Sequence, residues 1–181
     1  MTAQIHDSLQ IEGQHFSIVG VNGNGLFDPG TLGVTLIPPM TSCWRGYICE
    51  YKVSDGRLLL DRLQLAIGTR FEPGQAPAPV PLTGPPINGV RPTLQKRGFN
   101  NIYENLNLEI PFTGSLQAGD GFIRELYVHM GFHPAWKYQT VLELSVEGGN
   151  VLAIRDISEQ MQQVRDRMRH SGEGAAKQKF Q

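Results

Sequence analysis

The sequence predicts a mainly β protein, in which two related antiparallel β-hairpin halves pack as a sandwich or a partly closed barrel, followed by one C-terminal α-helix. Apolar and polar residues alternate in several short segments, which is typical of half-buried strands. The first 150 residues are broken by glycine and proline too often for a long helix. Apolar residues at helical spacing occur only after residue 157. With 181 residues, the chain is long enough to bury a sizeable core as one domain.

Three segments are predicted to be β-hairpins, because each has alternating strands joined by residues that tolerate a positive φ. They span residues 8–21, 47–65 and 140–157, with turns at Glu12-Gly13, Asp55-Gly56 and Gly148-Gly149. A further glycine-rich stretch, VNGNG at residues 21–25, resembles a phosphate-binding loop only superficially. No helix can start in the residues that follow it, which include Pro29, so a tight β-turn is the stronger interpretation.

Two tryptophan-led segments indicate an internal duplication. Gly56 and Gly149 align at an offset of 93 residues, and Trp44 and Trp136 align at an offset of 92. The halves would span about residues 8–68 and 100–157 of a single β-domain at 1–157. Each half alone could not bury its apolar face, whereas packing the two together would do so. The alternative is that unrelated hairpins share alternation and turn residues.

A proline-rich loop at residues 69–99 is predicted to join the halves. Seven prolines between Pro73 and Pro92 rule out a central strand. Either this loop is a flexible or polyproline linker, or its apolar residues lie over the core; those residues are Val80, Leu82, Ile87, Val90 and Leu94.

The C-terminus is predicted to be a helix at residues 158–170 and a disordered tail at 171–181. Ile157, Met161, Val164 and Met168 form one helical stripe, which we expect to dock on the sheet. Asp156 or Ser158 would cap the start of the helix.

The composition indicates which partners to expect and in which cellular compartment the protein works. The chain has 16 basic and 17 acidic residues and a net charge of −1, which argues against a protein that grips nucleic acid or an anionic membrane. Cys43 and Cys49, if on one strand, would be ~20 Å apart and unable to form a disulfide. Two free thiols and the absence of a signal-like N-terminus predict a cytoplasmic protein.

His129 and His133 form the most site-like pair, because histidines four residues apart can bind one metal ion on a helix. On a strand they would lie ~13 Å apart, so they could share a metal only across a turn at Gly131. A third ligand would come from Asp120, Glu125 or Cys43. Ordinary strand-end histidines are the more common explanation, so we predict no cofactor and no metal. No catalytic residue is predicted either; Cys43 beside Arg45 is the better of the two thiol candidates.

The tryptophans carry the remaining functional signal. Each is followed by a basic residue and then a tyrosine, which is the composition of binding hot spots. The alternative is that each ring fills the core of its half. The predicted ligand- or partner-binding residues are Trp44, Arg45, Tyr47, Tyr127, His129, His133, Trp136 and Tyr138.

We therefore expect a non-catalytic β-protein that acts by binding, most simply to another protein in an accessory or immunity-type role. One alternative is an enzyme with a His/Cys or metal site near His129 and His133. Another is a β-barrel that holds a small ligand. The sequence does not predict an oligomeric state.

Overall fold

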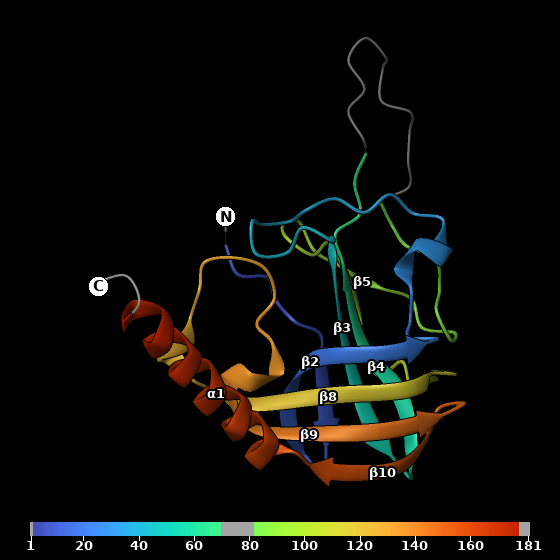
Figure 1. Cartoon of the computed structure of the whole chain (residues 1–181). Helices are drawn as coiled ribbons and strands as arrows, with labels where there is room; N and C mark the ends of the chain where they lie inside the picture. Colours follow the sequence, from blue (N-terminus) through green and yellow to red (C-terminus); the bar gives the residue numbers. More distant parts are fainter. Residues whose placement is uncertain (1, 70–81, 178–181) are drawn as a thin grey trace.

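The computed structural model describes residues 2–69 and 82–177, and the side chains up to residue 169 (Figure 1). The mainly β prediction is confirmed, and within the described residues the centre of the fold is a closed barrel of seven strands. In chain order these are β1 (Ser8–Ile11), β2 (Gln14–Asn24), β3 (Tyr47–Ser54), β4 (Arg57–Leu65), β8 (Thr113–Phe122), β9 (Tyr138–Glu147) and β10 (Asn150–Asp156). Around the barrel they follow the order β10-β9-β8-β2-β1-β3-β4, and β4 returns to β10.

The three predicted hairpins are confirmed as the antiparallel pairs β1–β2, β3–β4 and β9–β10. Each pair of turn residues has two positive φ angles, as tight hairpin turns require: 50° and 82° at Glu12-Gly13, 49° and 71° at Asp55-Gly56, and 53° and 84° at Gly148-Gly149. The hairpins are thus built by local sequence.

The barrel closes at a short seam between β4 and β10. In the described residues this pairing has the single register pair Asn150–Arg57. The Leu58 amide donates to the Gly149 carbonyl at 2.8 Å, and the Val151 amide donates to the Gly56 carbonyl at the same distance. Beyond the seam, β4 pairs instead with two short strands, β7 (Leu108–Glu109) and β6 (Asn101–Tyr103).

The described part of the proline-rich loop packs partly on the core. Ile87 is buried and Val90 packs against the same cluster, whereas Leu82 and Leu94 are exposed. Leu94 belongs to β5 (Thr93–Leu94), an edge strand paired with β6. Val80 lies outside the described residues. The interpretation of a loop laid over the core therefore holds for its middle, at Ile87 and Val90.

The predicted duplication is not confirmed. The first strands of the two matched hairpins, β3 and β9, have different neighbours on the side away from their hairpin partners. Strand β3 pairs there with the parallel strand β1, whereas β9 pairs with the antiparallel strand β8. The turn predicted at residues 21–25 is wrong, because residues 21–24 continue β2 and pair with β8. The glycines there allow close backbone approach: a Cβ on Gly23 would lie 2.2 Å from the Thr113 carbonyl oxygen.

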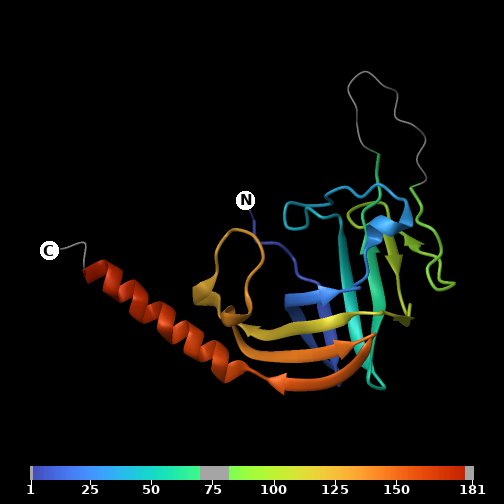
Figure 2. The same ribbon diagram turned by 45° about the vertical axis from the view of Figure 1, so that its right-hand side comes forward.

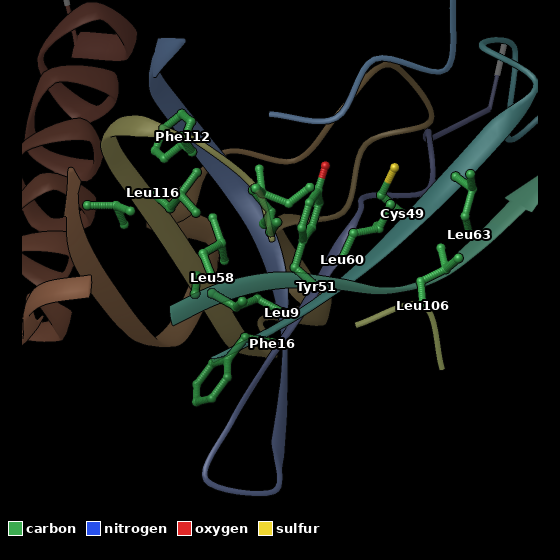
Figure 3. Close-up of a cluster of buried hydrophobic side chains, with 14 of the residues drawn as sticks. Leu9, Phe16, Cys49, Tyr51, Leu58, Leu60, Leu63, Leu106, Phe112 and Leu116 are labelled. Carbon is green, nitrogen blue, oxygen red and sulfur yellow. The ribbon is translucent and has the colours of Figure 1, made fainter. Parts of the chain in front are cut away.

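Apolar side chains of the described residues fill the interior of the barrel. Figure 3 shows Leu9, Tyr51 and Leu116 coming together from β1, β3 and β8. A second, smaller cluster lies between the barrel and the C-terminal helix and contains Ala135, Tyr138, Val141 and Ile157. Alternation along β9 sends Leu142, Leu144 and Val146 into the barrel cluster, since every second residue faces the same side.

Helix α1 (Ser158–Lys177) begins at the predicted place. The Asp156 carboxylate accepts the Ser158 amide at 2.8 Å. Hydrogen bonding from the Ser158 side chain, followed by that from its amide, lowers the pKa of Asp156. Ile157 and Met161 pack in the smaller cluster, whereas Met168 is 47% exposed. Figure 2 shows α1 extending away from the barrel toward the C-terminus. The predicted boundary at residue 170 is wrong, because the helix continues to Lys177; residues 178–181 lie outside the described residues. None of the helices in the described part of the chain has the length and apolar character needed to cross a bilayer.

Candidate functional site

One end of the barrel is covered by three segments that are far apart in sequence. They are the N-terminal residues 2–7, the loop 36–46 before β3, and the loop 123–137 between β8 and β9, which contains the 3-10 turns η2 (Arg124–Leu126) and η3 (Ala135–Lys137). The N-terminal segment runs between the two loops (Figure 1). Its Gln4 amide donates to the Gly131 carbonyl at 2.8 Å, and its Ile5 amide donates to the Ser42 carbonyl at 2.9 Å. We call this face the end surface.

A partly buried ion pair ties the N-terminal segment to the loop 36–46, and a hydrogen bond ties it to β3. The Arg45 guanidinium donates to both carboxylate oxygens of Asp7, at 2.8 and 2.7 Å, and the Cys49 amide donates to the same carboxylate at 2.6 Å. Burial raises the pKa of Asp7, and the Arg45 charge opposes that rise. The guanidinium also lies 4.7 Å from the centre of the Tyr47 ring, so the predicted residues Arg45 and Tyr47 are in contact.

His6 links the N-terminal segment to the loop 123–137. Its Nδ1 lies 2.8 Å from the Ile18 carbonyl oxygen, which can only accept a hydrogen bond, so Nδ1 carries the proton. Its Nε2 accepts the backbone amide of His133 at 3.1 Å and is therefore unprotonated. The ring must be neutral to hold both partners. Burial lowers the pKa of His6, which agrees with this geometry.

The loop 123–137 and its flanks hold an aromatic cluster. The Tyr127 ring lies 4.8 Å from the His129 ring and 5.2 Å from the His133 ring. Phe122 lies 4.7 Å from His133 and 5.3 Å from Tyr138, centre to centre. Four predicted site residues, Tyr127, His129, His133 and Tyr138, are therefore brought together in one cluster of packed rings.

The histidines do not form a metal site in the described residues. His129 is exposed and meets the Tyr127 ring edge to face, whereas His133 is buried, with its Nδ1 3.4 Å from the Lys137 ammonium. Burial, followed by the Lys137 charge, lowers the pKa of His133. No group of three His, Cys, Asp or Glu side chains that could hold a metal ion occurs within residues 2–69 and 82–169. Asp120, Glu125 and Cys43 thus do not complete a site with the histidines.

Neither tryptophan fills the core, which corrects the interpretation that each ring plugs its half. Trp44 is 55% exposed at the edge of the loop 36–46, and Trp136 is partly buried beneath the Lys137 ammonium, 5.3 Å from its ring centre. Both lie just before the first strand of a hairpin, but at that point the chain is a loop or a 3-10 turn, which leaves the indoles outside the barrel.

The cysteines are both buried and free. Cys43 donates its thiol proton to the Tyr47 carbonyl at 3.3 Å. Cys49 lies in the barrel core, where burial raises its pKa well above the usual range. Neither thiol is in contact with His129 or His133, so the nucleophile pair considered from the sequence is not assembled.

Several residues of this end were not predicted from the sequence. His6, Asp7 and Phe132 act through contacts with residues up to 127 positions away, and no local pattern signals them. Arg165, in contrast, lies one turn after Met161 on the apolar face of α1. A charged residue in an apolar stripe is visible in the sequence and could have indicated a buried role.

No family model, curated protein sequence or solved structure matches this chain. The functional argument therefore depends on the geometry of the chain itself.

Proposed function

We propose that this protein acts by binding another protein through the end surface. The observation that carries the proposal is the concentration of exposed apolar side chains on the three segments that meet there. They are Ile5, Ile37, Met40, Trp44, Tyr127, Val128, Met130 and Phe132, each at least 36% exposed. A high density of exposed apolar side chains on one face is typical of protein docking sites.

The kinds of side chain favour a protein partner. Trp and Tyr dominate binding hot spots, and Met adapts its shape to a partner surface. Pro38, Met40, Thr41 and Trp44 line a hollow of about 650 Å³ on this surface, in which Trp44 forms a wall. The partner we expect presents apolar side chains to the hollow.

The end surface is held in place before binding, which lowers the entropic cost of association. Asp7 fixes the N-terminal segment to the loop 36–46 and to β3, and His6 fixes it to the loop 123–137. The Phe132 ring lies 5.1 Å from the His6 ring and 5.7 Å from the Arg45 guanidinium. The exposed Phe132 ring thus packs on His6 and Arg45, which are themselves held by hydrogen bonds.

The alternatives have less support. An enzyme at His129 and His133 would need a carboxylate or thiol within hydrogen-bonding reach, and the described residues provide none. A ligand-binding barrel would need convergent polar groups inside, whereas the interior cluster is apolar.

A paired capture experiment tests the proposal. Tagged wild-type protein, a Trp44→Ser/Met130→Ser variant and a Leu152→Ser variant are compared for the proteins that each retains from the native cell. Leu152 is a matched control, because it is 63% exposed on β10 whereas Met130 is 59% exposed on the end surface. We expect a partner retained by the wild type and by Leu152→Ser, and lost by the double variant. Equal retention by all three would overturn the proposal, as would a purified protein that dimerises through this surface.

Two further hypotheses accompany this proposal. The cytoplasm is supported as the location by the two free, buried cysteines, which fit a reducing compartment. A duplicated hairpin unit is supported by the position of Trp44 and Trp136, each just before a hairpin, and by the contact of those hairpins at the seam.

A further inference from the structure

A pocket between α1 and the loop 123–137 lies apart from the hollow of the end surface. It has a volume of about 220 Å³ and is lined by Leu126, Trp136, Arg165, Met168 and Arg169. Liquid water occupies about 30 Å³ per molecule, so the volume matches a ligand of roughly the size of seven waters. Three lining side chains are apolar and two are cationic.

The Arg165 charge at this pocket has no carboxylate partner among the described side chains. Arg165 is 6% exposed. Its guanidinium donates hydrogen bonds to the carbonyls of Trp136 and Tyr138, both at 2.8 Å, and to the Gln162 side chain. Among the side chains described up to residue 169, no carboxylate lies within 4.0 Å of the Arg165 nitrogens. Carbonyl oxygens satisfy its hydrogen bonds but leave a full positive charge.

A second buried cation, Lys137, contacts Trp136, one of the residues that line the pocket. Lys137 is 5% exposed, and its ammonium lies over the Trp136 ring and beside His133. It too has no carboxylate within 4.0 Å among those described side chains. Arg169 has one long contact, 3.9 Å from an Asp166 oxygen. Burying cations without counter-ions is costly, and an anion in the pocket would offset that cost.

We infer that this pocket binds a small monoanionic carboxylate that carries an apolar group. The carboxylate lies against Arg165 and Arg169, and the apolar group packs against Trp136, Leu126 and Met168. The planar donors of the Arg169 guanidinium match the two oxygens of a carboxylate, whereas Arg165, whose donors are largely engaged, contributes mainly its positive charge. The apolar lining excludes a highly hydrated multivalent anion. This inference does not depend on the protein-binding proposal, because none of the five lining residues belongs to the exposed apolar set of the end surface.

The test compares phenylacetate with its neutral analogue phenylacetamide by NMR on the full chain. The two indole N–H signals serve as reporters: Trp136 lines the pocket, and Trp44 lies on the end surface as an internal control. We expect phenylacetate to shift the Trp136 signal with a Kd on the order of 1 mM, leaving the Trp44 signal in place. The amide should bind about tenfold more weakly, because it lacks the charge that the guanidinium groups recognise.

A matched pair of helix variants completes the test. Arg169→Gln should weaken phenylacetate binding about threefold, the modest effect expected of an exposed charge, whereas Arg167→Gln, on the same helix outside the pocket lining, should not. Arg165 is left intact because it holds two backbone carbonyls. The inference is overturned if the acid and the amide bind equally, if neither shifts Trp136 at about 10 mM, or if the two variants behave alike.

Discussion

Protonation of His6 should weaken the fold as the pH falls. The neutral ring accepts the His133 amide and donates to the Ile18 carbonyl, and a proton on Nε2 would replace the acceptor with a second donor. Burial lowers the pKa of His6 in the folded state below its ordinary value of 6.5, so the unfolded chain binds the proton more readily. The stability contributed by the neutral ring is therefore present above pH 6.5 and is lost as the pH falls toward the folded pKa. Positive charge on His133 and on the Arg45 guanidinium also lowers the pKa of His6 and acts in the same direction.

The size of the effect is bounded by proton linkage. One group changes the free energy of unfolding by at most about 1.4 kcal/mol per pH unit, so His6 can contribute at most about 2 kcal/mol between pH 6.5 and about pH 5. Urea unfolding at about pH 7.5 and pH 5 measures this loss for the wild type and for His6→Gln, whose side chain does not titrate. The control is His15→Gln, which changes an exposed histidine on β2.

The variants should separate cleanly. At about pH 7.5, His6→Gln is expected to be about 1–3 kcal/mol less stable than the wild type, since two hydrogen bonds are perturbed. On acidification it should lose less stability than the wild type, whereas His15→Gln should follow the wild type. An acid-induced loss of the same size in wild type and His6→Gln would refute the assignment of the neutral tautomer as a stabilising link.

Three further predictions concern stability in urea at neutral pH. Asp7→Asn should cost about 2–3 kcal/mol, because it leaves the partly buried Arg45 charge without its carboxylate; a loss under about 0.5 kcal/mol would contradict this. Trp136→Ala should cost about 1–3 kcal/mol and Trp44→Ala less than about 1 kcal/mol, because only the first ring is partly buried; the reverse order would show that the tryptophan environments are wrongly assigned. Gly114→Ala should cost at least about 2 kcal/mol, because φ is +147° and the added Cβ would lie 2.1 Å from a backbone oxygen of β2; a neutral effect would argue against this strand pairing.

The parts of the fold that were predictable from the sequence are those set by neighbouring residues. The turn at Asp55-Gly56 needs two residues with positive φ between alternating strands, and both requirements are visible within a dozen residues. The start of α1 is equally local, since Asp156 caps the helix and Ile157 begins its apolar face.

The parts that were missed depend on distant partners. The parallel pairing of β1 with β3 joins Ser8 to Glu50, and no local pattern selects it over an antiparallel alternative. The sequence predicts a tight turn at VNGNG because no helix can start in the residues that follow it, which include Pro29. Here glycine allows two strand backbones to approach closely, a need that arises only once β8 lies opposite.

Some features of the candidate site were likewise predictable from neighbouring residues, and others depend on distant ones. Aromatic and basic residues beside Trp44 and Trp136 were recognisable by type, and the structure brings Tyr127, His129, His133 and Tyr138 into one cluster. Their exposure was not predictable, because it depends on whether the chain before each hairpin is strand or loop. The supporting residues were missed for the same reason, since His6 meets its partner only across the folded barrel.

The short seam between β4 and β10 makes the molecule mechanically anisotropic. Strand β10 is held along its length by β9 but meets β4 at a single register pair, and it leads directly into α1. Tension applied through α1 would peel β10 away from β4 first, while the long contact between β8 and β9 stays intact. The amide protons of β10 should accordingly exchange with deuterated solvent sooner than those of β8, so that the barrel opens at its seam before it unfolds as a whole.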